Sequence, residues 1–383
     1  MSENTQPIIR VRDLHVGIPM DEGLLTPVRG VDFEIYPGET LGLVGESGCG
    51  KSLTSKAILG INDNKCFSIG EILFRPDVKQ PAVDILSLER VSKWKPLMPW
   101  TITQRLEERV HDIARFEAAR RVGDPIRPIP GKKKEAIRQL RAIRGKQISM
   151  IFQEPMVAFS PMYTIGNQIN ECTRLHITRD RHESKRITLE MMKMVGIANA
   201  EKRYDQYPHE FSGGMLQRAL IAMALVCKPR LLIADEPTTA LDVTIQAQIL
   251  ELMQSLQKEL GMAILFITHD LGTVAKMCDR VAVMYLGKIV ETGPARDIYK
   301  NPQHPYTRGL MGSVHKIGTL KQDRLFSIEG TVPLALNLQP GCGFYDRCDA
   351  RIEGLCDKVT PTLTPCDGQH CVACHRCQRK EEA

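Results

Sequence analysis

The sequence predicts an α/β fold with a parallel sheet, and three observations support this. Short apolar runs at residues 41–44, 231–234 and 263–267 are typical of strands that are buried on both faces. Segments with helical periodicity alternate with these runs, most clearly at residues 243–260. A glycine-rich loop follows the first run and precedes a helix. Alternating strands and helices favour a sheet with helices on its faces.

The segments before the second of these runs follow in chain order. Residues 8–44 show the alternation of β-strands. Residues 80–145 are less regular, and we expect a helical insertion there, with one helix at residues 102–116 and a second, basic helix at residues 132–144. Another strand is expected at residues 148–152.

The rest of the chain divides into a helical region and a change of composition. Residues 155–227 are expected to form a helical subdomain. Near residue 300, helical periodicity fades, and prolines, glycines and cysteines accumulate. The sequence therefore predicts one domain over residues 1–300 and a cysteine-rich C-terminal extension over residues 301–383.

Composition excludes several classes of protein. The net charge of +6 is local, because residues 101–146 hold 13 Lys/Arg against 6 Asp/Glu and the rest of the chain sums to about −1. Aromatic residues make up only 5%, which argues against a surface that stacks nucleic-acid bases. No nucleic-acid partner is therefore expected. The basic insertion fits a solvated surface, an anionic lipid surface or an acidic partner.

No segment of the sequence reads as a membrane anchor or a secretion signal. The longest apolar stretch, residues 219–227, has nine residues, whereas a membrane-spanning helix needs about 18 or more. The first residues are polar and lack the apolar core of a signal peptide. We therefore expect a protein that is made and kept in the cytosol, either free or attached peripherally to a membrane.

The glycine-rich loop at residues 45–52 matches the phosphate-binding pattern G-x-x-x-x-G-K-S. Its backbone N–H groups and the following helix N-terminus suit the phosphates of ATP. Lys51 is expected to reach the β- and γ-phosphates, and Ser52 to bind Mg²⁺. The expected ATP-binding residues here are Gly45, Glu46, Ser47, Gly48, Cys49, Gly50, Lys51, Ser52 and Leu53.

A second motif supplies two carboxylates. The apolar run at residues 231–234 ends in Asp235 and Glu236. Asp235 is placed to hold Mg²⁺ through water, as at the end of a Walker B strand. Glu236 is placed to polarise the attacking water as a general base.

These motifs occur together with three others, and the set resembles the ATPase cassette of ABC transporters over about residues 8–300. Ser212-Gly213-Gly214 resembles the signature segment, Gln153 the glutamine of the Q-loop, and Thr268-His269-Asp270 the switch histidine. The resemblance implies a P-loop ATPase whose helical subdomain carries the signature. It also implies head-to-tail dimers, in which the signature residues of one subunit contact the γ-phosphate held by the other. Gln153 would also reach Mg²⁺, His269 the transition-state oxygens, and Asp242 the loop that couples the two sites.

A narrower resemblance points to the dipeptide, oligopeptide and nickel importers. It is carried by residues 207–215, by residues 234–244 and by Asn301-Pro302-Gln303-His304-Pro305-Tyr306-Thr307. It implies an ATP-hydrolysing subunit that is peripheral to the cytoplasmic face of the cell (inner) membrane and powers uptake of peptides or a related small solute. The implied partners are two transmembrane permease subunits, a second ATPase subunit of the same or a paralogous kind and, indirectly, an extracytoplasmic solute-binding protein.

Seven of the twelve cysteines lie between residues 342 and 377, where thiolates suit iron–sulfur clusters or Zn²⁺. The corresponding extension of the peptide importers carries a [4Fe-4S] cluster in some members, and the resemblance implies the ligand set Cys342, Cys348, Cys356 and Cys374. The run of Cys371, Cys374 and Cys377 offers alternative ligands. Zinc and unligated thiols also remain open.

Two other classes of function fit the sequence less well. A non-transport ABC ATPase of DNA repair or translation usually carries two cassettes or a long coiled coil, and this chain has one cassette. An iron–sulfur redox enzyme would not need the complete set of hydrolytic motifs. The sequence names neither the solute nor the second ATPase subunit.

Overall fold

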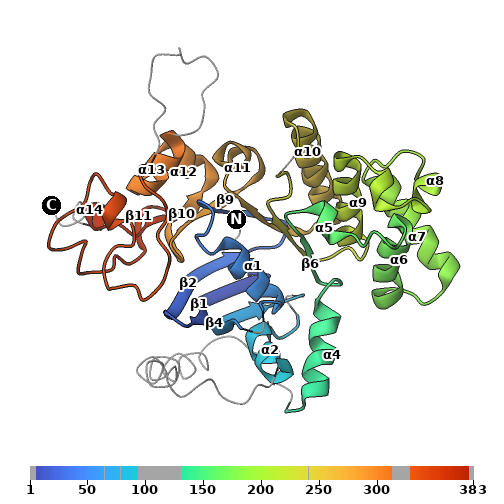
Figure 1. The fold of residues 1–383 in the computed structure, drawn as a ribbon, viewed down its shortest axis with the longest axis horizontal. Helices are drawn as coiled ribbons and strands as arrows, with labels where there is room; N and C mark the ends of the chain where they lie inside the picture. The colour runs from blue at the N-terminus through green and yellow to red at the C-terminus, as the bar shows by residue number, and fades with distance from the viewer. Residues whose placement is uncertain are drawn as a thin grey trace. The chain divides into compact units, whose positions relative to one another are not determined.

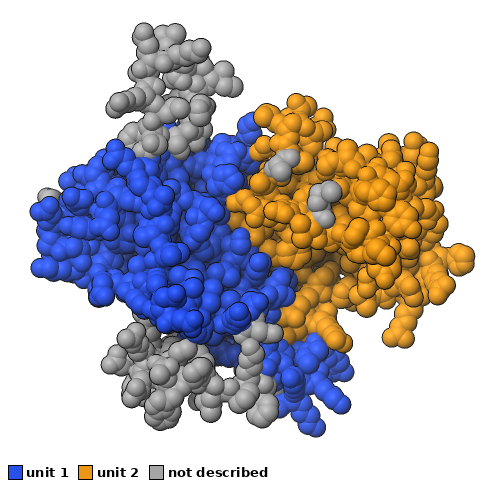
Figure 2. Space-filling view, in the orientation of Figure 1, with its two compact units in different colours: residues 1–34, 41–138, 268–383 blue, residues 35–40, 139–267 orange. Residues whose placement is uncertain are grey.

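The computed structural model describes residues 6–63, 65–77, 79–93, 131–239, 241–312 and 328–378. The chain forms two compact units, drawn in blue and orange in Figure 2. The first unit comprises residues 1–34, 41–138 and 268–383, and the second comprises residues 35–40 and 139–267. The helix expected at residues 102–116 lies outside the described residues.

An antiparallel sheet forms the N-terminal part of the first unit (Figure 1). Its strands, in the order β2-β1-β4-β5, are β1 (Ile9–Met20), β2 (Gly23–Ile35), β4 (Phe67–Phe74) and β5 (Val83–Asp84). Helix α1 (Lys51–Leu59) follows the glycine-rich loop, and α2 (Ile85–Lys93) packs on β4. The alternation at residues 8–44 predicted β-structure correctly, but it did not predict that these strands form an antiparallel sheet of their own.

A second run of strands in the first unit joins the loop-bearing strand to the C-terminal residues. It comprises β3 (Thr40–Val44), β9 (Arg280–Tyr285), β10 (Lys288–Pro294), β12 (His370–Val372) and β11 (Thr364–Asp367) in spatial order. Strand β3 pairs with β9 in parallel, and the remaining pairs are antiparallel. The helices here are α11 (Leu271–Met277), α12 (Ala295–Lys300), α13 (Pro305–Gly312) and α14 (His375–Gln378).

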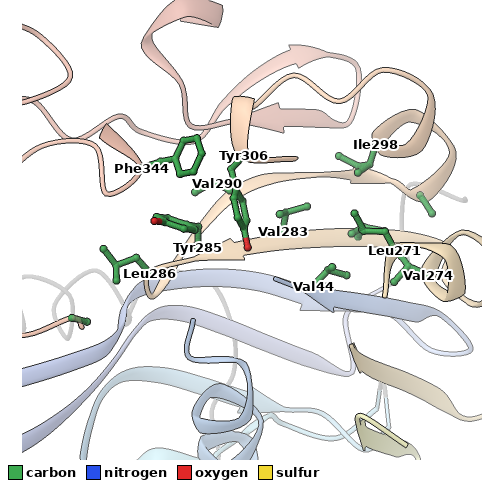
Figure 3. Close-up of a cluster of buried hydrophobic side chains, with 13 residues drawn as sticks. Val44, Leu271, Val274, Val283, Tyr285, Leu286, Val290, Ile298, Tyr306 and Phe344 are labelled. Carbon is green, nitrogen blue, oxygen red and sulfur yellow. The ribbon is translucent and has the colours of Figure 1, made fainter. Parts of the chain in front are cut away.

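A cluster of buried side chains joins these strands to the C-terminal segment, by which we mean residues 328–378. Figure 3 shows Phe344 of this segment beside Tyr285 and Tyr306. The Phe344 ring lies 5.1 Å from that of Tyr285 and 5.5 Å from that of Tyr306, centroid to centroid. Burial of an aromatic side chain is a large favourable contribution, so Phe344 anchors a segment that has few buried apolar residues.

The second unit holds the parallel strands that the sequence predicted. Strands β6 (Ile148–Ile151), β7 (Leu231–Asp235) and β8 (Ala263–Thr268) pair in parallel in the order β8-β7-β6. The expected helical subdomain contains α5 (Pro155–Ala158), α6 (Ile165–His176), α7 (Arg181–Met194), α8 (Ala200–Tyr204), the short 3₁₀ helix Pro208–Glu210 and α9 (Gly213–Leu225). Helix α10 (Val243–Leu260) has the bounds that its periodicity predicted, and α4 (Lys133–Ile143) lies where the basic helix was expected.

Candidate ATP site and cysteine cluster

The glycine-rich loop keeps its shape because two of its glycines have no room for a side chain. A Cβ atom on Gly45 would lie 2.1 Å from the carbonyl oxygen of Met284, and one on Gly50 would lie 2.1 Å from that of Pro27. Gly50 also has φ of 102° and precedes the first residue of α1. Only glycine combines this backbone conformation with such close approach.

Lys51 begins α1 and turns its ammonium group back over the loop. Its Nζ donates hydrogen bonds to the carbonyl oxygens of Gly45, at 2.7 Å, and Glu46, at 3.0 Å. The residue is only 5% exposed. Ser52 and Leu53 follow it and are half-buried. A buried ammonium group that two carbonyl oxygens hold at the N-terminus of a helix is suited to bind a phosphate.

Cys49 points into the protein. The residue is fully buried, and burial raises the pKa of its thiol, against the lowering effect of Lys51. The thiol is therefore protonated at neutral pH and inert toward reagents that require a thiolate.

The two candidate carboxylates lie at the end of β7 in the second unit. Asp235 is buried, whereas the Glu236 carboxylate accepts hydrogen bonds from Gln153 Nε2, at 2.9 Å, and Thr239 Oγ1, at 3.2 Å. The structure thus brings together Gln153 and Glu236, which are 83 residues apart. The hydrogen bonds fix one carboxylate oxygen of Glu236, as a general base requires.

The backbone of Glu236 adopts an unusual conformation. Its φ is 47°, which is uncommon for a residue other than glycine. Its N–H donates to the carbonyl oxygen of Ile267 at 2.9 Å, and this hydrogen bond holds the residue in place. Strained backbone of this kind gathers at functional sites.

Two expected interface residues begin helices of the second unit. The Ser212 hydroxyl accepts from the N–H of Met215 at 3.4 Å and caps α9, and Asp242 accepts from the N–H of Ile245 at 2.9 Å and caps α10. Ser212 and Gly213 are exposed, and Gly214 is half-buried. A capping hydroxyl keeps its own hydrogen to donate, so Ser212 and the start of α9 are available to an anion.

His269 is exposed and lies between β8 and α11 in the first unit. Its neighbour Asp270 caps α11 by accepting from the N–H of Gly272 at 2.8 Å. The first unit thus carries residues 45–53 and His269. The second unit carries the remaining expected residues of the ATP site, namely Gln153, Asp235, Glu236, Ser212, Gly213, Gly214 and Asp242.

The four cysteines of the expected ligand set share one cavity in the first unit. Cys342, Cys348, Cys356 and Cys374 all line it, together with aromatic and basic side chains. Cys366, Cys371 and Cys377 are not among its lining residues. Within the described parts of the chain, no group of three or more His, Cys, Asp or Glu side chains is arranged to hold a metal ion.

The thiols that line this cavity, and the neighbouring thiol of Cys377, differ in acidity. Burial raises the pKa of Cys342 to about 11, and the neighbouring cysteines add to this. The Cys377 thiol donates to the Cys374 sulfur, and this hydrogen bond lowers the pKa of Cys374 below its ordinary value. Cys374 is therefore the thiol of this pair that ionises first, and the thiolate is the form that binds metals.

Two residues beyond position 300 reach the glycine-rich loop and were not found by sequence reasoning. The Glu46 N–H donates to the Tyr306 hydroxyl at 2.8 Å. The Arg347 guanidinium forms an ion pair with the Glu46 carboxylate, also at 2.8 Å. Tyr306 and Arg347 both lie in segments that carry the resemblance to the peptide importers, but no local pattern indicated their contacts with Glu46.

Known proteins support the class that these sites define. The sequence model of the ABC transporter family matches residues 28–105 and 126–239, and that of the oligopeptide/dipeptide transporter C-terminal region matches residues 290–356. The structure is similar to the ATP-binding cassette MJ0796 bound to ADP and Pi, with a TM-score of 0.53, 19% identity and coverage of 75% of this chain and 99% of that one. The chain therefore belongs to the ABC transporter family, as an ATPase whose substrate is ATP with Mg²⁺.

Curated relatives show to which group within the ABC family the chain belongs. It is 41% identical over 381 residues to the dipeptide transport ATP-binding protein DppD of Bacillus subtilis, which covers 99% of this chain and 97% of the relative. It is 42% identical over 339 residues to the oligopeptide transport ATP-binding protein OppD of the same organism, with coverage of 88% and 80%. Within the ABC family, it therefore belongs with the ATP-binding proteins that carry the oligopeptide/dipeptide C-terminal region.

None of the described helices has the length and apolarity of a membrane span.

Proposed function

We propose that this chain hydrolyses ATP to drive the uptake of peptides, or of a related small solute, through membrane-embedded partners. The observation that carries the proposal is the full-length match to a dipeptide transport ATP-binding protein, which includes the C-terminal region as well as the cassette. Its partners are two permease subunits, a second ATPase subunit and, indirectly, an extracytoplasmic solute-binding protein. The chain acts at the cytoplasmic face of the cell membrane.

The residues of the site take distinct roles in this proposal. Residues 45–53 bind the phosphates of ATP, with Lys51 on the β- and γ-phosphates. Ser52, Gln153 and Asp235 hold Mg²⁺ directly or through water. Glu236 takes the proton of the attacking water, and the hydrogen bond from Gln153 Nε2 keeps its carboxylate oriented. His269 stabilises charge on the γ-phosphate as hydrolysis proceeds.

A second ATPase subunit completes each site. The exposed Ser212-Gly213-Gly214 segment at the start of α9 meets the γ-phosphate held by the opposite subunit. The Ser212 hydroxyl and the helix N-terminus both favour an anion there. Asp242, which caps α10, couples the two sites. ATP then biases an equilibrium between open and closed dimers.

The test of this function is uptake of a radiolabelled dipeptide by cells in which the chain is replaced by Lys51→Ala or by the wild type. Uptake should be lost with Lys51→Ala and restored by the wild type. Pull-down of the tagged wild-type chain should recover two integral membrane proteins. Recovery of ribosomes or DNA-repair proteins alone, with normal dipeptide uptake in both strains, would assign the chain to the non-transport class.

We also propose that Cys342, Cys348, Cys356 and Cys374 hold a [4Fe-4S] cluster, with Zn²⁺ as the alternative. The support is that the four thiols line one cavity. Each thiolate would bind one iron, and the group would fasten a segment with little apolar surface.

Iron, sulfide and zinc determination on the anaerobically purified full-length protein tests this second proposal. A cluster predicts about four irons and four sulfides per chain, and zinc predicts about one Zn²⁺. Cys342→Ser should lower the metal content, whereas Cys366→Ser, a neighbouring thiol outside the cavity, should not. A metal-free wild type, or equal metal content in both variants, would rule out this ligand set.

A further inference from the structure

Glu46, in the glycine-rich loop, is held from the C-terminal side of the chain. Arg347 donates from Nη1 to Oε2 at 2.8 Å and from Nη2 to Oε1 at 3.1 Å, so that the guanidinium and the carboxylate meet through two parallel hydrogen bonds. The Glu46 N–H donates to the hydroxyl of Tyr306, which is fully buried. Paired hydrogen bonds of this kind fix orientation as well as distance.

The backbone carbonyl group of Glu46 connects this residue to Lys51. The Glu46 carbonyl oxygen accepts from Lys51 Nζ at 3.0 Å. The N–H, the carboxylate and the carbonyl of Glu46 therefore all have partners, and the last of these partners is the ammonium expected to meet ATP. A rotation of the peptide unit that carries the Glu46 carbonyl therefore moves the oxygen atom that accepts the hydrogen bond from Lys51 Nζ.

Arg347 itself is fixed by contacts that Glu46 does not share. Its Nε donates to the carbonyl oxygen of Glu329 at 2.9 Å, and Nη2 donates to that of Gly330 at 3.0 Å. Its side chain is only 7% exposed, and the guanidinium lies over the rings of Tyr285 and Phe344. The hydrogen bonds with Glu46 raise the pKa of Arg347 above its already high ordinary value, so it is always charged.

We propose that Arg347 is a positioning residue for ATP hydrolysis, which sets the glycine-rich loop through Glu46 so that Lys51 meets the phosphates of ATP. The C-terminal segment then contributes to the ATP site without touching ATP. The inference rests on the proposed role of Lys51. The C-terminal segment, whose cysteines had suggested only metal binding, thus also affects ATP hydrolysis.

The experiment measures KM for ATP and kcat on the full-length protein, purified with its membrane partners. Arg347→Ala should raise KM about fivefold to tenfold, since a paired hydrogen bond to a charged group is lost, and should change kcat much less. Arg347→Lys keeps the charge but not the paired geometry, so its KM should lie between those of the wild type and Arg347→Ala. Arg296→Ala is the matched control, because Arg296 is an exposed arginine of α12 in the same unit and does not line the cysteine cavity.

A double-mutant cycle separates positioning from loss of structure. If Arg347 acts through Glu46, then Arg347→Ala in a Glu46→Ala background should not raise KM further. Glu46→Gln keeps the size of the side chain and every other contact of Arg347, so it should raise KM even if Arg347→Ala fails to fold. An unchanged KM in Glu46→Gln overturns the inference, as does an equal rise caused by Arg347→Ala in both backgrounds.

Lys51→Ala distinguishes failure of this inference from failure of the proposed ATP site. If Lys51→Ala abolishes activity while Glu46→Gln and Arg347→Ala leave KM unchanged, the ATP site stands and the positioning role is wrong. If Lys51→Ala itself hydrolyses ATP normally, the assignment of the loop is wrong, and the positioning role is wrong with it.

Discussion

The glycine-rich loop and the C-terminal segment lie in the same unit but gain their order in different ways. The loop is set between a strand buried along its whole length and a helix that is mostly buried. The C-terminal segment has strands of only four and three residues, β11 and β12, and its buried apolar residues are Ala335, Phe344, Val372 and Ala373. Its order therefore depends more on polar contacts with distant residues.

One buried pair shows what replaces apolar burial in this segment. Glu291 of β10 is fully buried, and its carboxylate lies 2.7 Å from His370 Nε2 of β12. It also accepts from the backbone N–H groups of Gln303 and His304. Burial acts to raise the pKa of Glu291, but these hydrogen bonds outweigh it and hold the pKa below its ordinary value. Substitutions in the cassette should therefore mainly alter chemistry, whereas substitutions in the C-terminal segment should mainly alter stability and the position of the glycine-rich loop.

The largest effect is expected at Glu236, where only chemistry should change. Glu236→Gln should bind ATP but hydrolyse it about 10²- to 10⁴-fold more slowly, because the general base is lost. The unfolding transition should stay that of the wild type, since the amide fills the same space. Single-turnover hydrolysis and thermal melting measure both. Wild-type turnover in this variant would remove Glu236 as the base.

Next in size is the loss of the buried pair in the C-terminal segment. His370→Ala leaves the buried Glu291 carboxylate without its imidazole partner, so the free energy of unfolding should fall by about 3 kcal/mol. Hydrolysis at saturating ATP should persist in the folded protein. Urea unfolding gives the stability. His370→Gln, which retains a donor, is the control and should lose less; equal losses in both variants would show that the hydrogen bond to Glu291 is unimportant.

A smaller, pH-dependent effect is expected at His304. Burial lowers its pKa from 6.5 to about 4, and its Nδ1 accepts from the N–H of Tyr306. Between these pH values the unfolded chain binds a proton that the folded protein does not, so stability falls as pH falls. From pH 7 to pH 5, this loss is about 2 kcal/mol.

His304→Asn keeps an acceptor for the Tyr306 N–H and removes the titrating group. Its unfolding free energy should therefore fall less than that of the wild type when urea unfolding is repeated at pH 7 and pH 5. Equal pH dependence in the two proteins would mean that His304 does not contribute.

The smallest effect is expected at Cys49, although it lies inside the ATP-binding loop. Its thiol is buried and protonated, so iodoacetamide should leave it unmodified in the folded protein, and Cys49→Ser should change turnover by less than about twofold. Peptide mass spectrometry after alkylation, with the urea-unfolded protein as the positive control, measures the labelling. Rapid loss of ATPase activity through labelling at Cys49 would show that the loop opens far more than its burial indicates.

Sequence reasoning succeeded where neighbouring residues determine the structure. The α/β class, the parallel strands β6, β7 and β8, and the bounds of α10 all followed from periodicity. The glycine pattern of the loop followed from backbone geometry, because positions 45 and 50 have no room for a side chain. Reasoning from periodicity missed the antiparallel sheet of the first unit, because alternation along a strand does not name its partner. The roles of the individual ATP-site residues and the division near residue 300 stay predictions.

The sequence by itself determined the phosphate-binding loop, the strand that ends in two carboxylates and the cysteine-rich end, because each is a contiguous pattern with chemically constrained spacing. The resemblance of the whole set of motifs indicated an ABC cassette. Tertiary structure alone decided which distant groups meet. It placed Arg347 on Glu46 across 301 residues of chain. The four cysteines that line one cavity, Cys342, Cys348, Cys356 and Cys374, are by contrast the set that the family resemblance had already grouped. The contact between Arg347 and Glu46 has no local signal, since the two residues are brought together only when β9, β10 and the C-terminal segment pack around the shared core of Tyr285, Tyr306 and Phe344.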